Sequence, residues 1–418
     1  MRVFKFGGAS LRTASGIRQV AKIVGQADRP LVVVVSAMGK TTNLLEKIHA
    51  GLRTGTPVDF LTAECRDYHQ SIVKELFADG GQHVAAEVDN LINGFTDDAR
   101  HPLPFDATYD QVVSKGEVIS SIIVSHFLAG ICPDVQWLDA RKLIATDNTF
   151  REGKVLWDET GKRIKEAIGN SKAEVFVTQG FIGGAENGLT TTLGREGSDF
   201  TAAIFASVLE ASSVTIWKDV PGVMSADPKR LPDAIVFPEL PFREAAEMTY
   251  YGASVIHPKT IKPLANKGIP LLVRNFDDPA LPGTNIHECV VRDLPPLIVF
   301  KDNQVLISCK VTDYSFVNEH QMHLIFHILT ELDVRVNVMQ NSAISFSFCI
   351  DFRESKLTAL IARLQEHFEV YYNTGLTLIT VKNYDAETFE RYRRLAGVIL
   401  EQSSRSTLQV LLKGQDSE

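Results

Sequence analysis

Short apolar segments alternate with helical patterns from the start of this chain to about residue 275, and this alternation constrains its fold more than any other feature. The segments that we expect to form strands are 3–6, 31–35, 135–138, 175–178, 214–217 and 271–273. Segment 31–35 contains only Leu and Val, which is typical of a strand buried on both faces of a sheet. The pattern therefore predicts an α/β fold with a mostly parallel sheet sandwiched by helices.

Polar and glycine-rich residues follow these expected strands at their carboxyl ends. They are Gly7 and Gly8, 36–39, Asp139, 179–180 and 218–219. Because ligands of open parallel sheets bind beyond the carboxyl ends of the strands, we expect the functional site at this edge of the sheet.

The pattern changes after Pro282 and Gly283. The expected order becomes strand 305–311, helix 319–331, strand 334–339, strand 345–351, helix 355–367 and strand 377–381. This is a β-α-β-β-α-β order, which is typical of an α+β ferredoxin-like module. A further helix and one strand, at 407–412, are expected after it. We expect a first domain at 1–285, a linker at 286–300, a module at 301–383 and a partial second module at 384–418.

The charge and cysteine content narrow the possible partners and the compartment. A net charge of −8 and a pI near 5.8 argue against nucleic-acid and membrane partners, which need a basic surface. The five cysteines are scattered and form no Cys-x-x-Cys pair, so we expect free thiols in a reducing compartment. We find neither a signal peptide nor an apolar run that approaches the roughly 20 residues of a membrane span. The expected location is the cytoplasm.

The most informative motif is residues 191–203, Thr-Thr-Leu-Gly-Arg-Glu-Gly-Ser-Asp-Phe-Thr-Ala-Ala. We expect Ser198 to cap a helix whose first turn contains Asp199. A helix N-terminus favours an anion, and Arg195 can hold a carboxylate through two parallel hydrogen bonds. An ordinary capped helix after a glycine turn explains the motif equally well when it is considered alone.

Two motifs near the N-terminus could contact phosphate or substrate. Lys5 precedes Gly7 and Gly8 at a strand end, where a phosphate could meet backbone N–H groups. Segment 36–45 contains Gly-Lys-Thr but lacks the earlier glycine of a Walker A sequence. Its hydroxyls, Ser36 and Thr42, can contact a substrate or cap a helix.

Later motifs add further charged candidates. Glu117 opens an apolar helix, where a carboxylate can serve the helix dipole or hold an ammonium group. Lys218, Asp219 and Arg230 lie around a Pro-Gly turn, and Lys259 follows a His-Pro pair. We find no spacing typical of metal ligands, no Gly-x-Ser-x-Gly elbow and no protein-kinase signature.

Taken in order, these motifs resemble the aspartate kinases of the amino-acid-kinase family. The matching segments are Lys-Phe-Gly-Gly-Ala-Ser at 5–10, 34–45, 191–203, 217–223, 250–260 and 269–284. The C-terminal module resembles the ACT domains that these enzymes carry.

The resemblance implies transfer of the γ-phosphoryl group of MgATP to the β-carboxylate of L-aspartate, the first step toward lysine, threonine and methionine. It assigns Lys5 and Asp199 to catalysis, Ser36, Thr42, Glu117, Arg195 and Ser198 to aspartate, and Lys5, Gly7, Gly8, Lys218, Asp219, Arg230 and Lys259 to ATP. The nucleophile is already a carboxylate, so catalysis would consist of positioning and charge stabilisation.

Three residues depart from the family pattern. Ala9 replaces a threonine, and Lys218 and Pro221 replace a threonine and an aspartate in the nucleotide loop. A related kinase of another small acid, such as glutamate or a nucleoside monophosphate, is an alternative. A catalytically silent amino-acid sensor is another, although Lys5 and Arg195 are retained.

The ACT-like region implies a homodimer joined through residues 301–383, because exposed sheet edges tend to be paired. It also implies an effector pocket. Asn337 and Ala343 stand where the family commonly has carboxylates. We therefore expect weak or absent inhibition by lysine.

Overall fold

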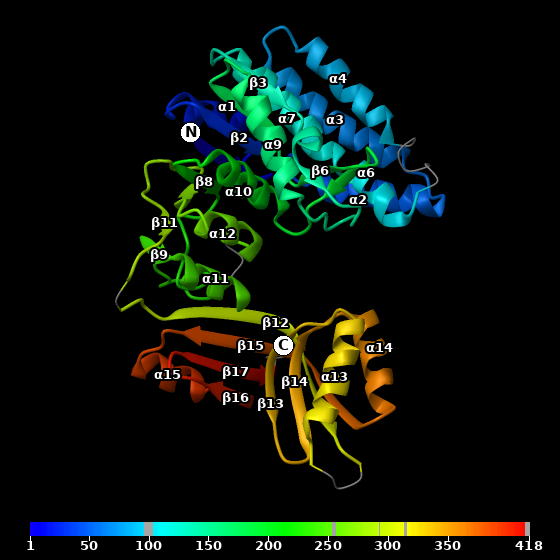
Figure 1. The fold of residues 1–418 in the computed structure, drawn as a ribbon, viewed down its shortest axis with the longest axis vertical. Coiled ribbons are helices and arrows are strands. Elements are labelled where there is room, and N and C mark those ends of the chain that lie inside the picture. Colours follow the sequence, from blue (N-terminus) through cyan, green and yellow to red (C-terminus); the bar gives the residue numbers. More distant parts are fainter. Residues whose placement is uncertain (96–102, 253–255, 292, 313–315, 414–418) are drawn as a thin grey trace. The chain divides into compact units, whose positions relative to one another are not determined.

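A computed structural model describes residues 1–95, 103–252, 256–291, 293–312 and 316–413 (Figure 1). The chain divides into two compact units. The first comprises residues 1–223, 236–249 and 254–291, and the second comprises 224–235, 250–253 and 292–418. Each unit is described by itself below.

The first unit is built on an eight-stranded sheet in the order β3-β5-β2-β1-β8-β10-β11-β9. The strands are β1 (Arg2–Phe6), β2 (Leu31–Val35), β3 (Val135–Leu138), β5 (Val175–Gln179), β8 (Ser213–Lys218), β9 (Glu239–Pro241), β10 (Leu271–Asn275) and β11 (Thr284–His287). All neighbouring pairs are parallel except β10 with β11. The six expected strands are confirmed, and each ends within two residues of its predicted end. A small sheet, β4-β6-β7, uses β4 (Ala145–Thr146), β6 (Ile182–Ala185) and β7 (Thr190–Thr192).

Helices flank the large sheet, as predicted. They are α1 (Ala14–Gly25), α2 (Thr41–Thr54), α3 (Asp59–Leu76), α4 (Gln82–Asn93), α6 (Phe105–Val113), α7 (Lys115–Ala129), α8 (Ala140–Leu143), α9 (Trp157–Gly169), α10 (Gly197–Leu209), α11 (Phe242–Tyr250) and α12 (Pro258–Ala265). Helix α7 packs on β2, β3 and β5, and α10 packs on β1, β2 and β8. The five residues of β2 are fully buried between these layers, which explains its all-aliphatic sequence.

The stretch Phe105–Ala129, which contains α6 and α7, has the length and mean hydropathy of a membrane-spanning helix. The expectation that no apolar run approaches that length is therefore wrong. Within the first unit, 72% of its most apolar window is buried. Packing in the core accounts for its apolar character.

The second unit contains a six-stranded sheet in the order β13-β14-β12-β15-β17-β16. Its elements are β12 (Leu297–Lys310), α13 (Glu319–Glu331), β13 (Val336–Asn341), β14 (Ser345–Asp351), α14 (Glu354–Gln365), β15 (Glu369–Lys382), α15 (Ala386–Arg393), β16 (Val398–Ser403) and β17 (Thr407–Lys413). The predicted β-α-β-β-α-β order is present, but β16 was missed. The strands β12 and β15 are each 14 residues long and pair along most of their length.

Several predicted bounds in this region need correction. Strands β12 and β15 each begin eight residues before their predicted starts, at 305 and 377. The expected linker 286–300 overlaps the end of β11 and the first four residues of β12, so the stretch between strands is 288–296. The predicted strand 334–339 begins two residues later, at Val336.

Candidate active site

A cavity of about 590 Å³ lies at the carboxyl edge of the large sheet. It is lined by the ends of β1 and β8, by the loop after β2, and by the first turns of α7 and α10. The sequence-predicted residues that line it are Lys5, Gly8, Ser36, Thr42, Glu117, Arg195, Ser198, Asp199 and Lys218. Parallel topology brings together residues that are up to 213 positions apart, from Lys5 to Lys218.

A buried ion pair occupies the floor of the cavity. Lys5 Nζ lies 2.7 Å from Asp199 Oδ1, and the side chains are 11% and 3% exposed. Lys218 Nζ, at the end of the neighbouring strand, lies 3.7 Å from Asp199 Oδ2. One carboxylate therefore faces two ammonium groups.

The protonation state of Asp199 follows from this arrangement. Burial alone raises the pKa of a carboxyl group, but the charges of Lys5 and Lys218 outweigh burial and hold the pKa of Asp199 below its usual value. Asp199 is therefore ionised at neutral pH. The cavity keeps one net positive charge from these three groups for an anionic ligand.

Close backbone packing shapes the loops above the ion pair. A Cβ atom at Gly8 would lie 2.6 Å from the carbonyl oxygen of Ala37, so only glycine allows the β1 and β2 loops to meet. The N–H of Gly39 donates to the carbonyl of Gly8 at 2.9 Å. Gly194 has φ of +77°, which the turn before α10 requires.

The prediction that Ser198 caps α10 is wrong. The helix begins at Gly197, and its N-cap residue is Glu196 with φ of 55°. Ser198 lies inside the first turn and lines the cavity instead. Glu196, in a left-handed conformation that follows the Gly194 turn, takes the N-cap position two residues before Ser198.

Glu117 is buried in the first turn of α7. Its Oε1 accepts a hydrogen bond from the Ala37 N–H at 3.3 Å, whereas Oε2 has no hydrogen-bond partner. Burial raises the pKa of Glu117 to about 8, against smaller opposing effects from the Ala37 N–H and Lys5. A carboxyl group of this kind is ready to ionise when a cation approaches it.

Four of the predicted ATP-contacting residues do not line this cavity. Gly7 precedes the cavity-lining Gly8 in the sequence, and the carbonyl oxygen of Gly7 accepts a hydrogen bond from the Ser10 N–H. Asp219 lines a second cavity, of about 390 Å³, with Ala9 and Arg12. Lys259 is exposed in the first turn of α12.

Arg230 belongs to the second unit, where its guanidinium pairs with Asp302 and lies 4.8 Å from the centre of the Phe300 ring. The positive charge of Arg230 is therefore paired within the second unit.

A polar network that the sequence did not predict lies behind four of the cavity-lining residues, Glu46, Tyr109, Arg151 and Thr192. Asp110 is fully buried and accepts from the N–H groups of Arg151 and Thr192 at 2.8 and 2.9 Å. Arg151 stacks on the Tyr109 ring at 4.1 Å, and the Tyr109 hydroxyl donates to Glu46 at 2.5 Å. Nothing in the local sequence links these residues, because they come from α2, α6, β7 and a loop.

Comparisons with known proteins place these features in a wider group. The sequence pattern described as the Amino acid kinase family matches residues 1–275. Lysine-sensitive aspartokinase 3 of Escherichia coli (strain K12) is 31% identical over 403 residues, which cover 92% of this chain and 87% of that protein. Aspartokinase 1, chloroplastic, of Arabidopsis thaliana is 32% identical, over 84% of this chain and 63% of that protein. The chain spans 41% of a bifunctional aspartokinase/homoserine dehydrogenase of Zea mays.

A solved structure is similar over the whole chain. The E. coli aspartokinase III in complex with aspartate and ADP, in the R-state, has a TM-score of 0.85 and 28% identity. The match covers 100% of this chain and 97% of that one.

The raised pKa of Glu117 predicts a pH-dependent cost to stability. Between pH 4.5 and about 8 the folded protein keeps a proton on Glu117 that the unfolded chain has lost. Stability from this group therefore falls as pH rises through that window. We expect Glu117→Gln to gain stability over the wild type as pH rises from 4.5 to 8, with a constant difference above pH 8.

Urea denaturation at several pH values measures this difference. Glu64→Gln, at an exposed position on α3, is the control and should show no such trend. A Glu117→Gln difference that is flat from pH 5 to pH 9 would mean that Glu117 is ionised in the folded protein.

Proposed function

Because the chain belongs to the amino acid kinase family and, within it, to the aspartokinases, we propose that it transfers the γ-phosphoryl group of ATP to the side-chain carboxylate of L-aspartate. The observation that carries the proposal is the pair of ammonium groups, Lys5 and Lys218, held at one buried carboxylate in the cavity. A carboxylate oxygen of aspartate attacks the γ-phosphorus, the bond to the bridging oxygen breaks, and ADP leaves. The product is 4-phospho-L-aspartate.

The cavity offers complementary groups for each charge of aspartate. Arg195 is exposed at its rim, where its planar guanidinium can hold the α-carboxylate by two hydrogen bonds. The unpartnered Oε2 of Glu117 suits the α-ammonium group. The hydroxyls of Ser36, Thr42 and Ser198 line the same cavity and can orient the side chain.

Lys5 and Lys218 act on the transferring phosphoryl group. The nucleophile needs no deprotonation, so catalysis rests on alignment and on stabilising the charge of the transition state. Asp199 holds both ammonium groups in place and is a positioning residue. Lys218, a departure from the family pattern, adds a second cation at the centre.

The second cavity, with Asp219, Ala9 and Arg12, is the proposed continuation of the nucleotide site. Gly7 and Gly8 would approach the phosphates, and Lys259 and Arg230 remain candidates for nucleotide contact.

A Mg²⁺ ion bound with ATP neutralises phosphate charge, and the cavity fits such an ion. Glu196 has a buried carboxylate oxygen, Oε2, without a hydrogen-bond partner. Carboxylate oxygens are the ligands that Mg²⁺ prefers, together with water and substrate phosphates. Glu196 would hold the ion on the side of the cavity next to Asp199.

The proposed setting is the first step toward lysine, threonine and methionine, in the cytoplasm, without nucleic-acid or membrane partners. We also propose a homodimer joined through the ACT-like region, residues 301–383. The four cysteines at 65, 132, 309 and 349 are buried and all five are free, which agrees with a reducing compartment.

The second unit contains a cavity of about 580 Å³ whose polar wall bears on regulation. Asn337 accepts a hydrogen bond from Lys301 Nζ at 2.9 Å and donates to Asp351 Oδ1 at 3.0 Å. Lys301 also pairs with Asp351 at 3.6 Å. The carboxylate of Asp351 is thus engaged by Lys301, and Asp333 pairs with Lys356 outside the cavity.

The main test is the loss of Lys5. We expect Lys5→Ala to reduce kcat with aspartate by more than about 100-fold, the scale of removing one preorganised charge. A coupled assay of ADP release with aspartate, glutamate and nucleoside monophosphates measures it and separates the alternative substrates. Arg2→Ala, which removes a cation from the opposite end of β1, is the control and should keep its activity.

Two results would contradict this proposal. Near-normal turnover of Lys5→Ala would remove Lys5 from the centre. A wild-type protein without turnover of any of these acids would favour the amino-acid sensor.

The second test concerns recognition of aspartate. Arg195→Lys keeps the positive charge but loses the planar fork, so we expect a rise of at least tenfold in the KM for aspartate and a smaller change for ATP. Steady-state kinetics with each substrate varied provides both constants. Arg163→Lys, on the exposed face of α9, is the matched control. If neither constant changes, the α-carboxylate is held elsewhere.

The third test concerns feedback. With Asn337 and Ala343 in place of carboxylates, we expect weak or absent inhibition by lysine, unlike the lysine-sensitive relative. One charge-assisted hydrogen bond contributes about 1.5–3 kcal/mol, so Asn337→Asp should increase lysine sensitivity at least tenfold. Titrating lysine and threonine, singly and together, into the kinase assay decides it. Inhibition of the wild type by sub-millimolar lysine would show that the pocket already holds an ammonium group.

A further inference from the structure

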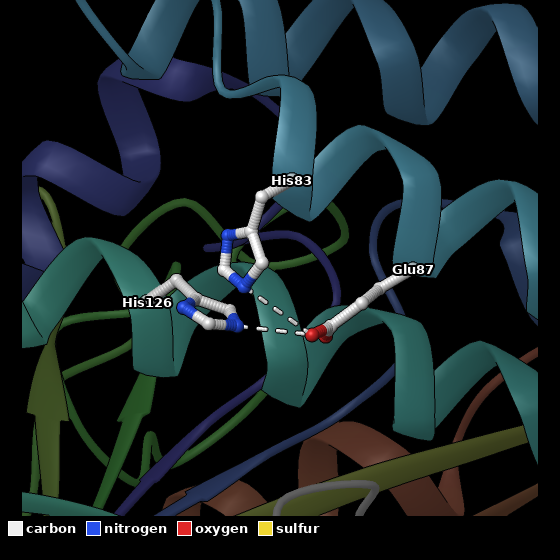
Figure 2. A group of neighbouring side chains, drawn as sticks. All are labelled: His83, Glu87 and His126. Carbon is white, nitrogen blue, oxygen red and sulfur yellow. Dashed lines mark ion pairs between the residues drawn. The ribbon is translucent and has the colours of Figure 1, made fainter.

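Three side chains of the kinds that bind metal ions lie close together on two packed helices of the first unit. His83 and Glu87 are one helical turn apart on α4, and His126 comes from α7 (Figure 2). The two imidazole rings point toward the same carboxylate from different helices (Figure 2). The spacing of these residues in the sequence does not indicate a metal site, because His126 is 39 positions away from Glu87.

The distances in this group match those between ligands of one small metal ion. His83 Nε2 lies 3.4 Å from Glu87 Oε1, and His126 Nε2 lies 3.5 Å from Glu87 Oε2. One ligand atom from each residue lies within 4.8 Å of the others. With metal–ligand bonds of about 2.1 Å, two ligands of a tetrahedral ion are about 3.4 Å apart.

The two imidazole rings contact each other at a surface that solvent reaches. The centroids of the His83 and His126 rings are 4.4 Å apart and the rings are perpendicular, so the rings meet edge to face. The side chains are 68%, 43% and 34% exposed for His83, Glu87 and His126. Solvent can therefore supply an ion and a water ligand, and each residue can be replaced without opening the core.

We propose that His83, Glu87 and His126 bind a divalent transition-metal ion such as Zn²⁺, with water as the fourth ligand. Two imidazole nitrogens and one carboxylate oxygen select such ions over Mg²⁺, which prefers oxygen ligands. The site is separate from catalysis. His126 is nine residues after Glu117 on α7, which is about 14 Å along the helix.

The ion would join α4 to the far end of the helix that presents Glu117 to the catalytic cavity. Its first effect is therefore on stability. An ion that binds only the folded protein raises the melting temperature as its concentration exceeds the Kd.

The test is metal titration of the full chain after removal of metals with a chelator. We expect Co²⁺ to produce the visible absorption bands of a tetrahedral site, and Zn²⁺ to displace it and raise Tm. His83→Ala and His126→Ala should each weaken Zn²⁺ binding by more than tenfold in calorimetry. Even the loss of a residue that only hydrogen-bonds to a metal ligand lowers metal affinity by about 10–100-fold. Kinase activity with Mg²⁺ should remain unchanged in both variants.

Two controls make the result specific. His327→Ala removes an equivalent pair with Glu331, four residues apart on α13 at 3.4 Å, and should leave metal binding unchanged. His287→Ala removes the other candidate group of the described residues, Glu239, His287 and Cys289. Zn²⁺ affinity and Co²⁺ bands that persist in both His83→Ala and His126→Ala overturn the proposal. So does a signal lost only in His287→Ala, or no binding at micromolar metal.

Discussion

The ion pair of Lys5 and Asp199 is the interaction on which the first unit depends. Two charges taken out of water are costly, and either of them alone would remain uncompensated in the core. Their contact at 2.7 Å joins the middle strand β1 to the first turn of α10. Lys218 completes the arrangement from the adjacent strand. The pairing with Asp199 offsets the cost of burying the charge of Lys5. It also fixes the positions of both ammonium groups, those of Lys5 and Lys218, before a substrate binds.

Preorganisation of this kind suits a reaction whose nucleophile is already charged. The residues of the cavity have no proton to remove from the substrate carboxylate. They contribute by positioning the substrates and by stabilising the charge of the transition state. Glu117 illustrates the opposite use of burial. Burial raises the pKa of Glu117 to about 8, and one of its carboxylate oxygens has no hydrogen-bond partner. An arriving ammonium group would compensate this carboxylate as Lys5 compensates Asp199.

The sequence predicted the first unit well because its signals are local. A strand such as 31–35 is aliphatic at every position, and glycines follow β1 where two loops meet. Ser198 was predicted wrongly as a cap, since Glu196 adopts a left-handed conformation that serine-cap patterns do not anticipate. The Asp110 network and the histidine pair were missed because their partners come from distant segments. The length of β12 and β15 was underestimated because polar residues interrupt their apolar patterns.

The two long strands have a consequence for how the second unit can change. Strand β12 pairs with β15 from Leu297 to Lys310, with register shifts between Lys301 and Leu306. Its first part shares the sheet with β17 through β15, and its second part lies against β14. The two halves of the sheet therefore share the strands β12 and β15 and are not joined by a linker. Removing either half of the sheet would cut both long strands and would take backbone hydrogen-bond partners away from the half that remains.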